Sequence, residues 1–109
     1  MGEERGLLGV EMRYGRYKKK FQELVDLAAG QGLKVEIVPD KVTYDFVGMN
    51  PLAARQLGFE CPPRVIQIDD HLNWKEKYHT LKHELIELGL MSEGMSYGSA
   101  HKIALRYEK

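Results

Sequence analysis

Histidine and glutamate recur along one short segment, residues 78–90, which reads YHTLKHELIELGL. His79 and His83 lie four positions apart, Glu84 follows His83 directly, and Glu87 lies four positions beyond it. In an α-helix, side chains four positions apart are neighbours on one face, so two such groups can bind one ion together. Imidazole nitrogens suit zinc, whereas calcium and magnesium prefer oxygen ligands. If the segment is helical, it predicts a zinc (Zn2+) site.

A zinc site needs at least one further ligand, and a hydrolytic site keeps one position open for water. His101 is the candidate, because a helical hairpin would return it to within about one turn of His83. Two ligand sets are then open: His79, His83 and His101, or His83, Glu87 and His101. We favour the first set, because three neutral imidazoles suit zinc and leave Glu84 uncoordinated.

The competing interpretation places the histidines on the solvated face of an ordinary amphipathic helix. Apolar residues recur at helical spacing on the opposite face, and this stripe should pack on a sheet. The stripe consists of Trp74, Tyr78, Leu81, Leu85 and Leu88. Against a solvated histidine face, Ile86 and Leu90 border it, and lysine and glutamate are better helix formers than histidine.

The elements that must position these groups follow from the periodicity of the chain. The predicted elements are a helix over 17–29, a strand over 33–39, a strand over 42–48, a helix over 51–58, a strand over 64–69, a helix over 73–91, and a last helix from Ser96 or Ser99 to near 109. The first two strands predict an antiparallel hairpin, and residues 1–14 a loosely ordered start. The order indicates a small α+β domain over residues 1–109. We expect a short, mostly antiparallel three-stranded sheet on the long site helix, with a C-terminal helix hairpin.

Composition narrows the class of protein further. Sixteen basic and sixteen acidic residues cancel, which gives no bulk electrostatic case for nucleic acid or an anionic membrane. The single cysteine, Cys61, excludes an intrachain disulfide and indicates a reducing compartment, where we expect it to serve in packing. The chain shows no long apolar run and no secretory signal, so we expect a soluble, cytoplasmic protein. Its oligomeric state is not indicated.

A basic cluster, RYGRYKKK over residues 13–20, has Tyr14 and Tyr17 interleaved with its charges. Such a pattern can grip a phosphate backbone while the tyrosines stack on bases. A solvated helix start is the commoner outcome, and we favour it here. Nucleic acid is therefore not the expected partner.

RVIQIDD, residues 64–70, and HELIE, residues 83–87, together resemble the strand and site helix of the zincins. That metallopeptidase class carries the motif H-E-x-x-H on its helix. The combination of HTLKHELIE with AHKIA is also similar to small phage and archaeal proteins grouped as metallopeptidases. The resemblance covers somewhat under half the chain.

His83 and Glu84 match the first two motif positions, while Glu87 stands where the motif has its second histidine. His79 and His101 have no position in the motif. The resemblance implies a zincin-like fold and a zinc-dependent hydrolase, with Glu84 as the catalytic base and a peptide or protein as substrate.

Two alternatives remain beside this expectation. Because the motif histidine is replaced, the chain is alternatively a non-catalytic, metal-stabilised module that binds a protein or nucleic-acid partner. Glu84 alternatively pairs with Lys77 or Lys102 on a solvated surface.

Overall fold

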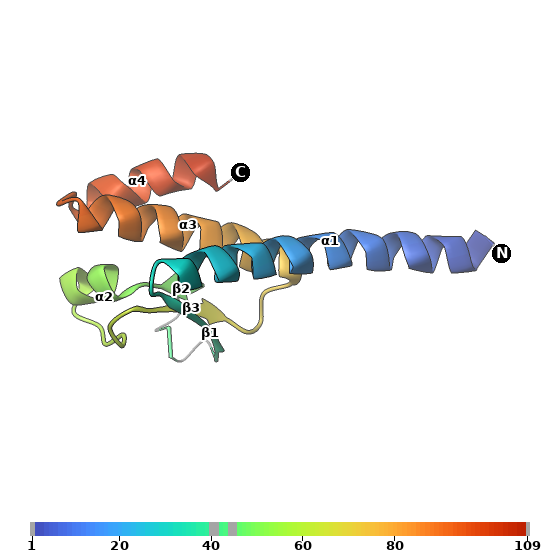
Figure 1. Ribbon diagram of the computed structural model, residues 1–109, viewed down its shortest axis with the longest axis horizontal. Helices are drawn as coiled ribbons and strands as arrows, with labels where there is room; N and C mark the ends of the chain where they lie inside the picture. Colours follow the sequence, from blue (N-terminus) through green and yellow to red (C-terminus); the bar gives the residue numbers. More distant parts are fainter. Residues whose placement is uncertain (1, 40–41, 44–45, 109) are drawn as a thin grey trace.

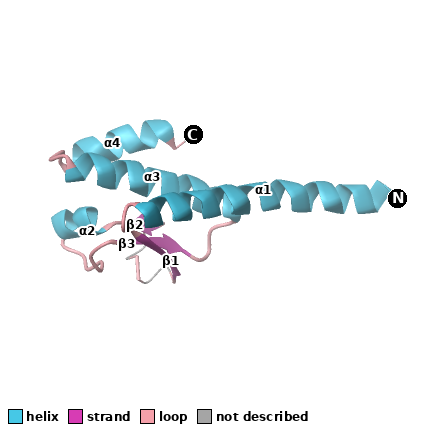
Figure 2. Cartoon of the chain, viewed as in Figure 1, coloured by secondary structure: helices cyan, strands magenta, loops and turns pink. Residues whose placement is uncertain are grey.

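The computed structural model describes residues 2–39, 42–43 and 46–108, and for residues 2–14 it describes the backbone alone. In this part of the chain, helices and a small sheet form an α+β fold (Figures 1 and 2), which confirms the predicted class. The elements in chain order are α1 (Gly2–Gly30), β1 (Lys34–Val38), β2 (Gly48–Met49), α2 (Pro51–Leu57), β3 (Val65–Asp69), α3 (Trp74–Ser92) and α4 (Tyr97–Tyr107).

The sheet is mixed, with the strand order β1-β3-β2. β3 pairs in parallel with β1 and antiparallel with β2, so the prediction of a mostly antiparallel sheet is wrong. All five residues of β3 are buried, and a short strand that is buried on both faces is typical of a central position. β1 therefore pairs with β3 and not with the segment that follows β1 in the chain.

The predicted hairpin partner over 42–48 is largely not a strand. Val42 and Thr43 lie in a turn, where Val42 N–H donates to the Pro39 carbonyl at 2.9 Å. Residues 44 and 45 lie outside the described residues, and β2 begins only at Gly48. β2 is only two residues long. It forms one edge of the sheet, and it also brings Gly48 and Met49 against α3.

α1 begins at Gly2 and not at the predicted residue 17, so residues 2–14 belong to this helix. Its second half packs along α3, where the Phe21 and Trp74 rings lie 5.5 Å apart, and its first half extends beyond the other elements (Figure 1). No helix in the described ranges is both long enough and apolar enough to cross a membrane.

α3 begins and ends close to the predicted residues. Asn73 accepts from the backbone N–H of Glu76, whose side chain accepts in return from the Asn73 N–H, which is a capping box. The predicted apolar stripe is confirmed: Leu81 and Leu88 are buried in the main core, and the rest of the stripe packs against it.

The predicted C-terminal hairpin is also present. Ser96 caps α4 by accepting from the Ser99 N–H, and α4 runs back along α3 (Figure 1). α3 is thus covered by α1 and the sheet on one side and by α4 on another. Because both sides are covered, the histidine-bearing face of α3 cannot be a fully solvated face.

Candidate metal centre

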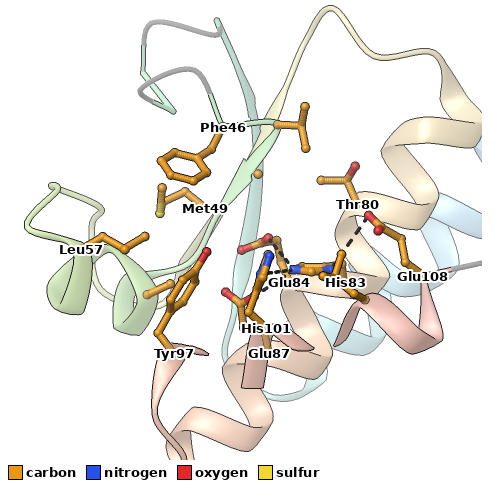
Figure 3. Close-up of a pocket in the computed structure, with 14 residues that line it drawn as sticks. Phe46, Met49, Leu57, Thr80, His83, Glu84, Glu87, Tyr97, His101 and Glu108 are labelled. Atoms are coloured by element: carbon orange, nitrogen blue, oxygen red, sulfur yellow. Dashed lines mark hydrogen bonds and ion pairs between the residues drawn. The ribbon is translucent and has the colours of Figure 1, made fainter. Parts of the chain in front are cut away.

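Three potential ligand atoms from α3 and α4 converge between the two helices (Figure 3). His83 Nε2 lies 2.9 Å from Glu87 Oε2 and 3.2 Å from His101 Nδ1. His101 Nδ1 lies 2.9 Å from the same oxygen of Glu87. His83 and Glu87 are buried, while His101 is partly exposed. We call these three residues the His–Glu–His cluster.

While Glu87 is ionised, protons satisfy this arrangement poorly. Each ring nitrogen has one position in its ring plane, which holds either a proton or a lone pair. If His83 and His101 both donate to an ionised Glu87, their two N–H groups face each other across 3.2 Å. If one ring instead presents a lone pair, that lone pair faces the carboxylate oxygen across 2.9 Å. A single cation bound to all three atoms removes the conflict.

The spacing and the donor types fit zinc. Ligand atoms about 2.0–2.1 Å from a tetrahedral zinc ion lie about 3.3 Å from one another, close to the separations in the His–Glu–His cluster. Two imidazoles and one carboxylate with a fourth position open to water are a donor set of catalytic zinc sites. The cluster lines a cavity, so water could reach a metal ion held by these three residues.

Asn50 ties α2 to this site. Its side-chain oxygen accepts from the Ala53 N–H at 2.8 Å and so caps α2, as the sequence predicted. Its amide nitrogen, which was not predicted to have a site role, donates to Glu84 Oε1 and to Glu87 Oε1, both at 3.1 Å. Asn50 is fully buried, and by holding one oxygen of Glu87 it leaves the other oxygen facing the two imidazoles.

Glu84 lies beside the His–Glu–His cluster without belonging to it. Its Oε2 is 4.0 Å from His83 Nε2, and its side chain is buried. The alternative in which Glu84 pairs with Lys77 or Lys102 is not found. Lys77 donates to the backbone carbonyls of residues 70 and 72, and Lys102 is exposed.

Burial and neighbouring charge shift the proton affinities of these groups. Burial, reinforced by the charge of Glu87, raises the pKa of Glu84 to about 8. Burial also acts to raise the pKa of Glu87, but hydrogen bonds from His83 and His101 outweigh it and hold that pKa below its ordinary value. Burial lowers the pKa of His83, but Glu87 and Glu84 raise it further than burial lowers it. Two carboxyl groups one turn apart therefore have opposite acid–base character.

His79 lies apart from the His–Glu–His cluster. Its ring packs against Tyr17 and Tyr78, with centroid distances of 6.0 and 5.1 Å, and it lines a different cavity together with Glu108. The favoured ligand set of His79, His83 and His101 is therefore not brought together, and the structure assembles the set with Glu87 instead.

The other residues considered from the sequence lie elsewhere. Cys61 Sγ donates to the Val65 carbonyl at 3.3 Å, and burial raises the pKa of this thiol to about 11. Asp69, Asp70 and His71 form a second group of possible ligands, but Asp69 is the last residue of β3, and Asp70 and His71 follow it in an exposed turn. Tyr17 is covered by lysines, with Lys20 Nζ 5.3 Å from the centre of its ring.

No protein family model, curated protein or solved structure matches the chain.

Proposed function

We propose that the protein is a zinc-dependent hydrolase, most simply a metallopeptidase, in which His83, Glu87 and His101 hold the metal. The observation that supports this most directly is the convergence of three ligand atoms within 2.9–3.2 Å of one another. A separate buried carboxylate, Glu84, stands 4.0 Å from one of them. The resemblance of residues 64–70 and 83–87 to the zincins supports the same function, with the ligand order changed.

A zinc ion at this site would polarise a substrate carbonyl and make water a stronger acid. Glu84 has the position of a general base, because it is close to the cluster while its Oε1 is held by Asn50. In the proposed reaction the ionised form of Glu84, which a cation held by the cluster would favour, takes one proton from the attacking water and returns it to the leaving nitrogen. The peptide C–N bond breaks, and the products are a carboxylic acid and an amine.

The metal is tested by elemental analysis of protein purified without an affinity tag. We expect about one zinc per chain in the wild type, and loss of that zinc in His101→Ala. Two imidazoles and a carboxylate also bind iron(II), so iron is measured in the same samples. Absence of any transition metal, together with no stabilisation by added zinc, would contradict the proposal.

The catalytic role is tested with Glu84→Gln, which keeps the shape of the side chain and removes its basicity. The variant should keep its zinc and its fold, but it should hydrolyse a peptide library at least about 100-fold more slowly than the wild type. A loss of about 100-fold is the low end of what a general base contributes to the rate. Equal hydrolysis by the variant and the wild type would show that Glu84 is not the base.

A non-catalytic role for the metal is the second candidate, and the placement of the ligands supports it. Two ligands come from α3 and one from α4, so a bound ion would join the two helices of the hairpin. Zinc at 100 times its dissociation constant would stabilise the fold by about 2.7 kcal/mol. Zinc-loaded protein that is stabilised in this way but inactive on every peptide and amide tried would favour a metal-stabilised binding module.

A further inference from the structure

A cavity of about 270 Å³ opens beside the His–Glu–His cluster, between α3 and α4 on one side and β2 and α2 on the other (Figure 3). Its wall opposite the cluster is largely apolar. This wall is formed by Phe46, Val47, Met49, Ala53 and Leu57, while Tyr97, which stacks on His101, and Leu105 line the cavity from α4. Phe46, Val47 and Leu105 are among the large apolar side chains that remain exposed, so apolar surface continues from the cavity to its mouth.

Apart from the two histidines, the charged side chains among the described residues that line this cavity are all acidic. Glu84, Glu87 and Glu108 line it, and none of the described lining residues is lysine or arginine. A ligand that carries a carboxylate into the cavity would meet three glutamates and, among the described lining residues, no lysine or arginine to pair with. Such a cavity has no side chain suited to bind the free carboxylate at the end of a peptide.

The size of the cavity limits what it can hold. Clefts that bury drug-sized ligands have volumes of about 300–1,000 Å³, so this cavity suits one side chain and the adjoining peptide group. Its apolar wall faces Glu84 and the His–Glu–His cluster, so a side chain seated there would lie next to the group that reacts.

We propose that the cavity binds one uncharged, apolar side chain of the substrate, next to the bond that is cleaved, and that it rejects acidic groups. This inference rests on the proposed hydrolase function and adds its substrate class: peptides with an apolar residue at the cleavage site, cut without recognition of a C-terminal carboxylate.

The test uses three hydroxamates, which bind active-site zinc through the same group and differ only in the tail. Acetohydroxamic acid has a single methyl group, 4-methylpentanehydroxamic acid has a branched apolar tail, and succinic monohydroxamic acid has an anionic tail. Each buried methylene contributes about fourfold in affinity. We expect the apolar tail to bind zinc-loaded protein at least about tenfold more tightly than acetohydroxamic acid, and the anionic tail to bind no more tightly than it.

A charge placed in the cavity wall should change this preference. Leu105 lies on α4 and is 44% exposed, so Leu105→Lys should fold normally while adding a cation to the cavity. The apolar hydroxamate should then lose most of its advantage, and the anionic one should gain about three- to tenfold. Leu27→Lys is the matched control, because Leu27 is 58% exposed on α1 and does not line the cavity.

The outcomes separate this inference from the proposed function. Equal binding of all three hydroxamates to zinc-loaded wild type would overturn the substrate class and leave the metal centre intact. Binding that ranks by tail but is unchanged in Leu105→Lys would place the tail outside this cavity and would also overturn the inference. Failure of the protein to hold zinc, with no hydroxamate binding, would instead overturn the proposed function itself.

Discussion

The two ends of one helical face differ although their sequence spacing is the same. His79 and His83 are four positions apart on α3, and so are His83 and Glu87. At the second end, three ligand atoms lie within 3.2 Å of one another. At the first end, the ring of His79 lies against two tyrosine rings, and its buried Nδ1 has no hydrogen-bond partner among the described residues, which is also true of His83 Nδ1.

The register of α4 against α3 accounts for this difference. The hairpin places His101 against His83 and Glu87, whereas Glu108, which lines a cavity with His79, brings its Oε1 within 4.0 Å of His83 Nδ1. Helical spacing thus supplies two candidate pairs, and the helix that packs across them determines which pair receives a third ligand. A pattern within one helix cannot make this choice, because it contains no information about the neighbouring helix.

The largest expected effect is a difference in zinc affinity between two alanine variants, one from each pair. Glu87→Ala should lower zinc affinity by more than about 100-fold, because the variant lacks a metal ligand. Loss of an outer-shell partner alone costs about 10–100-fold, and loss of a ligand should cost more. His79→Ala should leave zinc affinity unchanged within about threefold. Competition with a chromophoric chelator measures both dissociation constants.

The reverse result would restore the ligand set favoured from the sequence. If His79→Ala loses zinc and Glu87→Ala keeps it, then α4 sits in a different register in the metal-bound protein. Circular dichroism of both variants serves as the control for folding, since Glu87 is buried and His79 packs against aromatic rings.

A smaller effect is expected from Asn50, which contacts only the second end of the face. Asn50→Ser keeps a good helix cap but removes the amide that donates to Glu84 and Glu87. We expect a 10–100-fold loss of zinc affinity, about the cost of removing an outer-shell partner. The visible spectrum of the cobalt-substituted protein should also change, because both oxygens of Glu87 become free to coordinate.

Asn73→Ser is the matched control for this variant. Asn73 caps α3 in the same manner as Asn50 caps α2, but it is exposed and has no contact with the His–Glu–His cluster. Its substitution should change neither zinc affinity nor the cobalt spectrum. If the Asn50 variant behaves in the same way as this control, Asn50 is a helix cap and has no positioning role.

Local signals in the sequence were sufficient for most helices. Asn50 before Pro51, the cap at Asn73 and the serine at 96 each mark a helix start that the structure has. The strand pairing was not predictable in this way, because it depends on which strand the core buries on both faces. β3 is that strand, because its two faces carry the buried residues Val65, Ile66 and Ile68. The predicted hairpin is wrong because residues 33–39 and 42–48 are close in the chain but do not pair as strands.

The site was predictable in part for a related reason. Spacing and hairpin geometry point to His83 and His101, with Glu87 as an alternative ligand, and the resemblance to the zincin motif points to Glu84. The sequence indicates only the capping role of Asn50. Its hydrogen bonds to Glu84 and Glu87 connect positions that are 34 and 37 residues apart in the chain, and local patterns do not predict such contacts. The residue type is itself a signal, since an asparagine cap, unlike a serine or aspartate cap, also carries an amide that can donate to a neighbouring element.

The smallest expected effect concerns the close approach of β2 to α3 at Glu84. A Cβ atom at Gly48 would lie 2.7 Å from Thr80 Cγ2 and 3.0 Å from Glu84 Cγ, so Gly48→Ala must displace one of these side chains. Such overpacking costs about 1–3 kcal/mol. Gly89→Ala makes the same change on α3 with no atom within 4 Å, and it should stabilise the protein by about 0.8–1 kcal/mol through helix propensity. The urea midpoint of unfolding should therefore fall for Gly48→Ala and rise for Gly89→Ala.

Because Glu84 is not a ligand in the proposed site, Gly48→Ala should keep its zinc while hydrolysis falls. A Gly48→Ala protein that is as stable and as active as the wild type would show that β2 does not hold Glu84 in place.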